Sequence, residues 1–359
     1  MAQLFSPLKL REIALKNRIV VSPMCQYSAD GGMPNNWHLV NYGSRAVGGA
    51  ALVMAEATAV CPEGRITPWC TGIWSDAHTA AFRPITDFIR AQGSVPGIQI
   101  AHAGRKASCT QPWTGSQFIP LGAGGWQTVA PSAIPFSPAH GVPHTLTPDE
   151  IDGIVELFAE AACRALAAGF EVAEVHCAHG YLLNEFLSPL ANHRDDEYGG
   201  SLENRCRLPL RVAKTIRDLW PAQWPVFVRI SATDWVPQLN GRAGWDLAQS
   251  IQFAKWLKEI GIDLIDCSTG GMVPDAQIPA GPGFQVPFAA GVRKEAGIAT
   301  GAVGIITTPA QAEQILVDGQ ADAIFLAREL LRDPYWPLRA ARELGVDVEW
   351  PNQYVRAKR

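Results

Sequence analysis

The stretch from Thr147 to His176, TPDEIDGIVELFAEAACRALAAGFEVAEVH, contains the pattern that decides the fold. Its first four residues form a capping box with proline at the first helical position, which predicts a helix start. Apolar residues then recur on one helical face as far as Gly169, a typical helix stop. Glu171–His176 follows as a short apolar run, as expected for a parallel strand buried on both faces. This stretch therefore predicts one helix–strand unit of an α/β protein.

The same unit recurs along the chain. Eight short apolar runs are expected to be strands, and seven of the intervals between them carry helix-like patterns. The predicted strands are Arg18–Met24, Ala51–Ala57, Gly97–His102, Glu171–His176, Val226–Ile230, Leu264–Cys267, Ile298–Val303 and Ala323–Leu326. Eightfold alternation of strand and helix predicts an α/β fold, a single (β/α)8 TIM barrel.

Residues that typically start or end helices support the helices predicted for this barrel. Thr308-Pro309 opens one helix, which Gly319 closes, and Gly261 ends another that begins near Leu247. We expect Asp333-Pro334 to begin the helix that follows the eighth strand.

No composition shift marks a domain boundary, so we expect one domain over residues 1–359. An N-terminal cap at 1–16 should include a small hairpin that closes the bottom of the barrel, and 346–359 should form a C-terminal tail. The long Gly-, Pro-, Ser- and Trp-rich segment at 105–145 lies after the third strand. Loops of this length are usually functional, so we expect a lid or a subunit contact there.

Composition limits the possible partners. Hydrophobic residues make up 47% and charged residues 18% of the 359, which is typical of a globular protein. The net charge of -4 provides no basic field for nucleic acid. We find neither a signal peptide nor an apolar run of about 18 residues, and therefore expect a cytoplasmic protein without membrane contact. The eight cysteines contain no C-x-x-C pair and are expected to be free thiols.

In a barrel the carboxyl ends of the strands meet at one site. Strands seven and eight end in Gly301, Gly304 and Arg328, a combination that can hold a phosphate group with backbone N–H groups and a guanidinium. Strand four ends in His176 and His179, three residues apart. The two histidines could be structural or could bind zinc, but zinc needs a third ligand and none is evident, so no metal site is predicted.

Five ordered motifs follow the strand ends: Asn17–Tyr27, Gln99–Lys106, His176–Tyr181, Asn184–Pro189 and Arg194–Arg205. Through these motifs the chain resembles the Old Yellow Enzyme family of NADPH-dependent FMN ene-reductases, from residue 4 to the C-terminus. The five motifs together are specific, whereas any one alone would be weak. Cys25, the segment Arg328–Pro334 and the C-terminal tail are similar to those of the family's thermophilic-like bacterial subgroup.

The resemblance implies roles for individual residues. NADPH or NADH would reduce FMN, which would then transfer hydride to the β-carbon of an α,β-unsaturated carbonyl or nitro compound. The residues expected to bind FMN are Ser22, Pro23, Met24, Cys25, Ala57, Gln99, Arg229, Gly301, Gly304, Ala327 and Arg328. Those expected to face the substrate are Tyr27, His176, His179 and Tyr181, joined by Arg356 from a neighbouring subunit of a homodimer or homotetramer.

Among these residues, His176, His179, Tyr181 and Cys25 are the predicted catalytic group. The His pair would donate hydrogen bonds to the substrate oxygen as an oxyanion hole does, Tyr181 would donate the proton, and Cys25 would tune the flavin.

Two alternatives remain open at this point. Another FMN barrel, such as a dihydroorotate dehydrogenase or a tRNA dihydrouridine synthase, would need an acidic-substrate pocket or a basic RNA-binding domain, and the net charge of -4 opposes the latter. A metal-dependent hydrolase on the same barrel would be colourless, so the absorbance of the purified protein separates it from any flavoprotein.

Overall fold

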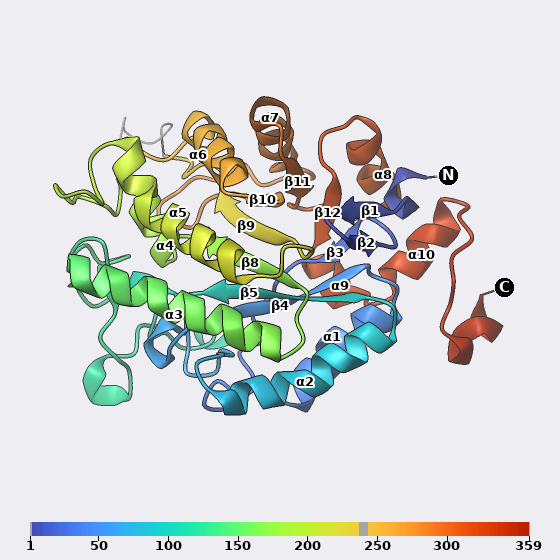
Figure 1. Ribbon diagram of the computed structural model, residues 1–359, viewed down its shortest axis with the longest axis horizontal. Helices are drawn as coiled ribbons and strands as arrows, with labels where there is room; N and C mark the ends of the chain where they lie inside the picture. Colours follow the sequence, from blue (N-terminus) through green and yellow to red (C-terminus); the bar gives the residue numbers. More distant parts are fainter. Residues whose placement is uncertain (1, 237–242, 359) are drawn as a thin grey trace.

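The computed structural model describes residues 2–236 and 243–358, and its centre is a closed barrel of eight parallel strands (Figure 1). Around the barrel these strands follow one another in chain order. They are β3 (Ile19–Val21), β4 (Leu52–Ala59), β5 (Val95–Ala101), β8 (Val172–Cys177), β9 (Val226–Ser231), β10 (Leu264–Ser268), β11 (Ala299–Ala302) and β12 (Ala323–Leu326). All eight predicted strands are confirmed, with ends that differ by up to three residues.

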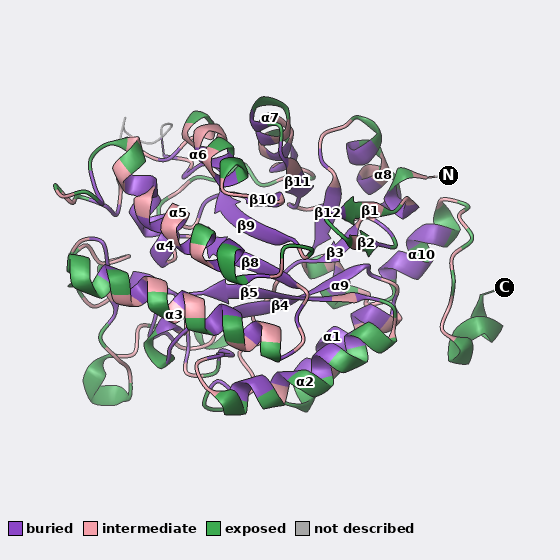
Figure 2. Ribbon diagram, viewed as in Figure 1, coloured by how far each residue is buried: buried purple, intermediate pink, exposed green. Residues whose placement is uncertain are grey.

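Helices surround the strands, as Figure 2 shows: the strands are buried, and the helices are buried on one side and exposed on the other. The long helices are α1 (Asn36–Val47), α2 (Asp76–Ala91), α3 (Pro148–Ala167), α5 (Leu202–Leu219), α6 (Leu247–Glu259), α7 (Val286–Ala296), α8 (Pro309–Val317) and α10 (Trp336–Glu343). Two short helices, α4 (Leu182–Leu187) and α9 (Arg328–Arg332), follow β8 and β12. The predicted (β/α)8 TIM barrel is confirmed.

The predicted capping box is present at the start of α3. The Thr147 hydroxyl accepts a hydrogen bond from the Glu150 backbone N–H (3.3 Å), and the Glu150 carboxylate accepts one from the Thr147 N–H (2.8 Å). Thr308 caps α8 in the same way, accepting from the Gln311 N–H (3.2 Å).

The prediction that Asp333-Pro334 begins a helix was wrong. The helix after β12 is α9, which starts at Arg328, and α10 starts only at Trp336. Instead of capping a helix, the Asp333 carboxylate accepts a hydrogen bond from the Tyr335 N–H two residues on (3.0 Å). This local bond stabilises a turn between the two helices.

The predicted N-terminal hairpin is formed by β1 (Leu8–Leu10) and β2 (Ile13–Leu15). Its Leu10 and Leu15 pack in one apolar cluster with barrel residues such as Phe227 and Phe325, so the hairpin closes the bottom of the barrel as expected. In Figure 1 the hairpin and the C-terminus lie at one end of the molecule and α4 lies at the other.

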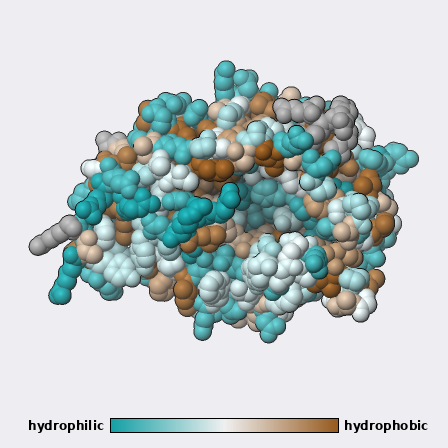
Figure 3. All heavy atoms as spheres, turned by 180° about the vertical axis from the view of Figure 1, so that it is seen from behind, coloured by the Kyte–Doolittle hydropathy of each residue, from teal (hydrophilic) through white to brown (hydrophobic). Residues whose placement is uncertain are grey.

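Short elements make up the rest. The segment at 105–145 overlaps or contains η3 (Gly104–Lys106), η4 (Pro112–Thr114), η5 (Leu121–Ala123), β6 (Val129–Ala130) and β7 (His144–Thr145). Elsewhere lie η1 (Gln3–Phe5), η2 (Pro62–Gly64) and, in the tail, η6 (Asn352–Ala357). The face in Figure 3 intersperses hydrophilic and hydrophobic side chains around a depression near its middle. Within the described ranges, no helix is long and apolar enough to cross a membrane.

Candidate active site

The carboxyl end of β8 brings the predicted trio of His176, His179 and Tyr181 together. The ring centroids of the two histidines are 5.3 Å apart with planes at 82°, and the Tyr181 ring centroid lies 5.1 Å from that of His176. His176 is only 3% exposed. The three side chains therefore form one polar and aromatic wall at the end of the strand.

His179 is positioned by three neighbouring segments. Its backbone N–H donates to the Ser231 hydroxyl at the end of β9 (2.8 Å), and its Nε2 lies 2.7 Å from the Ser268 hydroxyl at the end of β10. Lys106, which follows β5, donates from Nζ to the His179 carbonyl oxygen (2.7 Å). These contacts stabilise the left-handed backbone of His179 (φ 62°), which a residue other than glycine seldom adopts.

Both histidines are neutral at physiological pH. Burial lowers the pKa of His176 and of His179 well below the usual range, and the positive charges of Arg229 and Lys106 lower both pKa values further. A neutral imidazole carries one N–H donor, so the pair can offer two donors to one oxygen atom. Burial also lowers the pKa of Lys106, to about 8.

Two tyrosines near the His pair keep their hydroxyl protons. Burial raises the pKa of Tyr181 well above its usual value, and the nearby Cys25 thiol raises it further. Burial likewise raises the pKa of Tyr27, whose ring packs edge-on against Trp113 with centroids 5.8 Å apart. The predicted substrate residue Tyr27 thus links the site to the long loop, which contributes Trp113.

Cys25 lies half-buried after β3, where it was expected. A hydrogen bond with the Cys70 thiol, together with burial, raises the pKa of Cys25 well above its usual value. Gln26, the residue after Cys25, is held by Glu56 on β4. The Gln26 backbone N–H donates to the Glu56 carboxylate (2.9 Å), and the same carboxylate accepts from the Tyr42 hydroxyl (2.9 Å). A β-bulge between Ala55 and Ala57 accompanies this arrangement, with Glu56 as the extra residue.

Several residues of the predicted flavin site carry buried polar atoms that the protein does not satisfy. The Ser22 hydroxyl is fully buried without a hydrogen-bond partner. Nε of the buried Arg229 makes no aligned hydrogen bond either, although it lies 3.1 Å from the Asp266 carboxylate in an ion pair. Buried polar groups are normally paired, so unpaired ones at a strand end fit a polar ligand such as the edge of an isoalloxazine ring. Gln99, 2% exposed, lies on β5 two strands from Arg229.

Two of the three residues predicted to bind the phosphate group, Gly304 and Arg328, have features that suit this role, whereas Gly301 has another one. Gly304 has φ 120°, a conformation that side chains rarely allow, and Arg328 is exposed as the first residue of α9 just after Ala327. A Cβ on Gly301 would lie 2.3 Å from the Phe325 ring, so the structure gives that glycine a packing role. Pro23, Met24 and Ala57 lie at the same strand ends as predicted.

Arg356 is the one predicted site residue that the structure leaves apart from the others. It lies in the exposed η6 of the tail, where Tyr354 packs on Tyr335 with hydroxyl oxygens 3.3 Å apart. Figure 1 shows the C-terminus at the end of the molecule opposite α4. The tail of a single chain therefore does not reach its own His pair.

Sequence reasoning missed Glu174 and Asp266. Glu174 accepts a hydrogen bond from Gln99 Nε2 (2.8 Å), and Asp266 lies 3.1 Å from Nε of Arg229. Both acids are fully buried in barrel strands. A charged residue inside an otherwise apolar strand was the signal that could have found them.

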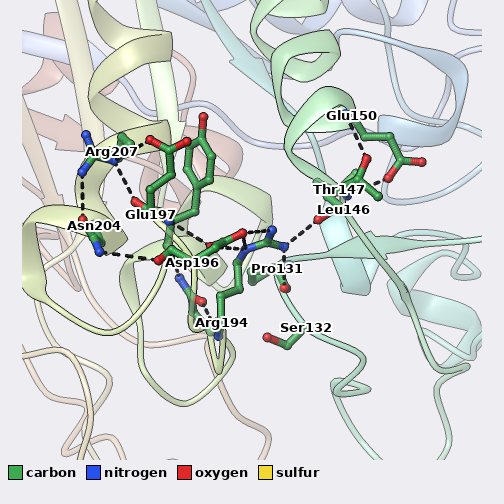
Figure 4. A network of polar contacts seen from close by, with 12 residues as sticks. Pro131, Ser132, Leu146, Thr147, Glu150, Arg194, Asp196, Glu197, Asn204 and Arg207 are labelled. Atoms are coloured by element: carbon green, nitrogen blue, oxygen red, sulfur yellow. Dashed lines mark hydrogen bonds and ion pairs between the residues drawn. The ribbon is translucent and has the colours of Figure 1, made fainter.

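The motif beginning at Arg194 is structural. Arg194 pairs with Asp196 and donates to the carbonyl oxygens of Pro131 (3.1 Å) and Leu146 (2.6 Å), as Figure 4 shows. Leu146 precedes the capped start of α3, so this network attaches the end of the long loop to that helix. Within residues 2–236 and 243–358, no group of three or more His, Cys, Asp or Glu side chains could hold a metal ion.

Comparison with known proteins shows a close similarity. The model of the NADH:flavin oxidoreductase / NADH oxidase family matches residues 3–346. Two relatives named NADPH dehydrogenase are similar over 99% of this chain: the one from Bacillus cytotoxicus is 49% identical over 96% of its own length, and the one from Geobacillus sp. strain WCH70 is 48% identical over 98%.

Solved structures show the same fold. Morphinone reductase in complex with tetrahydroNAD superposes with a TM-score of 0.78 at 29% identity, covering 97% of this chain and 92% of its own. An Old Yellow Enzyme homologue from Zymomonas mobilis gives 0.78 at 27% identity, covering 98% and 97%.

Proposed function

This chain belongs to the NADH:flavin oxidoreductase / NADH oxidase family, and on that premise we propose that it is an FMN-dependent ene-reductase that uses NADPH as its electron donor. The observation that carries the proposal is the neutral His176–His179 pair beside Tyr181, at the same barrel end as the unpaired hydroxyl of Ser22. The family match opposes the metal-dependent hydrolase as an alternative.

Bound FMN would supply hydride chemistry, accepting hydride from the nicotinamide and passing it to the β-carbon of an electron-poor C=C bond. Around it, Ser22, Gln99 and Arg229 would bind the polar edge of the ring, and the turn at Gly304 with Arg328 would bind the phosphate. Pro23, Met24, Ala57 and Ala327 would line the cofactor through their backbones and apolar surfaces.

The His pair would bind the substrate oxygen. His176 and His179, both neutral, would each donate one N–H to a carbonyl or nitro oxygen, and these bonds would strengthen as negative charge develops on it. Tyr181, which keeps its proton because burial raises its pKa, would supply the proton to the α-carbon. Tyr27 would contact the other side of the substrate, and Cys25 would act on the flavin as a thiol.

Purification tests the proposal first. The protein should be yellow, release FMN on denaturation and reduce cyclic enones, maleimides or nitroalkenes faster with NADPH than with NADH. A colourless protein that cannot be reconstituted with FMN contradicts the flavin assignment. A yellow protein that oxidises dihydroorotate but leaves every activated alkene unchanged would favour a dihydroorotate dehydrogenase instead.

We further propose that the whole chain forms one FMN-binding domain and that it acts in the cytoplasm as a homodimer or homotetramer. All eight cysteines are free thiols, which suits a reducing compartment. The separation of Arg356 from the His pair of its own chain supports a role for that arginine in the site of a neighbouring subunit.

A further inference from the structure

Beside His176 and one step deeper in the barrel, four neighbouring strands carry a belt of polar side chains: Gln99, Glu174, Arg229 and Asp266. Gln99 on β5 is in register with Glu174 on β8, and Arg229 on β9 is in register with Asp266 on β10. Gln99 Nε2 donates to Glu174 Oε1 (2.8 Å), and Arg229 Nε lies 3.1 Å from Asp266 Oδ2. The belt joins both predicted flavin contacts, Gln99 and Arg229, to an acidic residue.

The charges of this belt do not balance. It contains two carboxyl groups and one guanidinium, and none of the four side chains is more than 5% exposed. Glu174 Oε2 and both oxygens of Asp266 have no hydrogen-bond partner, because the Arg229–Asp266 pair is close but poorly aligned. An uncompensated buried carboxylate is costly, so the belt favours binding one proton.

That proton belongs on Glu174. Burial raises the pKa of Glu174 to about 8, and the charge of Asp266 raises it further, whereas Arg229 and the Gln99 hydrogen bond oppose the rise. Burial raises the pKa of Asp266 to only about 6, because Arg229 lies beside it. The buried thiol of Cys177 on the same strand also interacts with Glu174. Burial raises the pKa of this thiol well above the usual range, so it stays neutral.

The protonation state of Glu174 decides how the Gln99 amide turns. A carboxylate can only accept, so Gln99 must donate its NH2 group to it and present its oxygen elsewhere. A carboxylic acid can donate its O–H to the Gln99 oxygen, and the NH2 group is then free to face the opposite way. Protonation of Glu174 thus replaces the Gln99 oxygen, a hydrogen-bond acceptor, by the Gln99 NH2 group, a donor, on the side of the amide that faces away from Glu174.

We propose that Glu174 is a positioning residue that, at alkaline pH where it is ionised beside the oxidised flavin, takes up a proton when the flavin is reduced and thereby turns the Gln99 NH2 group toward the reduced flavin. The inference rests on the proposed function. Hydride from the nicotinamide brings two electrons and one proton to the flavin, leaving it with one more negative charge. At alkaline pH Glu174 then binds a second proton, supplied by solvent, and releases it when the substrate removes the hydride, so charge and protons balance over one cycle. At lower pH Glu174 keeps its proton in both redox states, and Gln99 stays turned toward the flavin.

The test is the midpoint potential of the FMN holoenzyme measured against pH. Below about pH 8 Glu174 is protonated in both redox states, so the wild type and Glu174→Gln, whose amide imitates the protonated acid, should have similar potentials. Above about pH 8 the wild-type potential should fall more steeply with pH than that of the variant. Equal slopes over the whole range would overturn the proposal.

Asp266→Asn provides the matched variant. It removes the negative charge that raises the pKa of Glu174, so the change of slope should remain but move to lower pH, by roughly one unit. If Glu174→Gln does not retain FMN, Asp266→Asn decides alone. A change of slope at the same pH as in the wild type would then contradict the proposal. A residue with only a structural role would alter FMN affinity without moving the pH profile.

Infrared difference spectra supply an independent readout. Reduction of the wild-type holoenzyme at about pH 9 should produce a protonated-carboxyl C=O band that Glu174→Gln lacks. Absence of that band from the wild type would contradict proton uptake by Glu174. A wild-type protein that binds no FMN overturns the proposed function and this inference together, whereas an active yellow enzyme without the band overturns the inference alone.

Discussion

Nζ of Lys106 lies 2.7 Å from the carbonyl oxygen of His179 and donates a hydrogen bond to it. The same ammonium group donates to the carbonyl oxygen of Gly271 (2.9 Å). The loops after β8 and β10 approach closely here, since a Cβ on Gly271 would lie 2.7 Å from the His179 backbone. One half-buried lysine after β5 therefore joins two strand-end loops and fixes the backbone of a predicted substrate-binding histidine.

Replacing Lys106 by Met should lower kcat/KM for enone reduction by about 10²-fold, because a displacement of about 1 Å at a positioned group has that effect. The reduction of FMN by NADPH should change much less. Stopped-flow measurement of the two half-reactions checks this. Equal losses in both would indicate a general folding defect instead.

Lys106 should also affect the pH dependence of stability. Burial lowers its pKa in the folded protein to about 8 from 10.5. Between these values the unfolded chain binds more protons than the native one, so the contribution of Lys106 to the free energy of unfolding rises with pH in this window. Denaturant titrations should show this rise in the wild type and its loss in Lys106→Met. An identical pH dependence in both proteins would refute it.

The His pair should matter for only one half-reaction. Replacing both His176 and His179 by Ala should spare flavin reduction and slow enone reduction, since each donor removed from a developing oxyanion costs about 2.7–4 kcal/mol, or about 10²–10³ in rate. Single-turnover rates with NADPH and then with an enone separate the two steps. His→Gln variants, which keep an N–H donor, serve as matched controls and should lose less activity.

Cys25 should remain a thiol and should not act as a nucleophile. Because its hydrogen bond with Cys70 and its burial raise its pKa well above the usual range, little thiolate exists near neutral pH. Timed alkylation followed by mass spectrometry should label the exposed Cys163 first and Cys25 slowly. Cys25→Ala should change the flavin potential and the kinetics but keep turnover. Rapid labelling of Cys25, or complete inactivity of the variant with FMN bound, would contradict this interpretation.

The barrel could be predicted from sequence because each buried parallel strand is a nearly continuous apolar run that needs no knowledge of its neighbours. The trio of His176, His179 and Tyr181 could be placed because all three lie within six residues of one strand end. Pairing between side chains of neighbouring strands could not: the Gln99–Glu174 contact joins residues 75 apart, and only the register of β5 with β8 brings them together. The turn at Asp333 was misread because an aspartate before proline suits a turn as well as a helix start.

Tyr42 should stabilise the bulge behind Cys25. Its buried hydroxyl donates to Glu56 Oε1 (2.9 Å) and accepts from the Glu56 backbone N–H (3.1 Å). Tyr42→Phe removes the hydrogen-bond partner of both the Glu56 carboxylate and the Glu56 backbone N–H. The free energy of unfolding should therefore fall by about 1–3 kcal/mol. Denaturant midpoints measure the loss. Tyr335→Phe, which removes a hydroxyl from an exposed contact, is the control and should change stability by less than about 0.5 kcal/mol.

The C-terminal tail should complete the active site of a neighbouring subunit through Arg356. The tail lies at the far end of its own chain from the His pair, and a guanidinium suits the rim of a site that binds a carbonyl oxygen. An Arg356→Ala chain and a chain carrying His176→Ala and His179→Ala should each be nearly inactive. Mixed and allowed to exchange, they should form dimers in which one of the two sites is intact, which gives about a quarter of the wild-type activity for an equal mixture.

A matched mixture separates this arrangement from an arginine that acts within its own chain. When one chain carries all three substitutions and the other is wild type, a mixed dimer has no intact site if Arg356 acts across the interface, but one if it acts in its own chain. The equal mixture should therefore retain about a quarter of the wild-type activity in the first case and about half in the second. Because exchange can be verified by mass spectrometry of differently tagged chains, a result of one half with exchange proven would assign Arg356 to its own subunit.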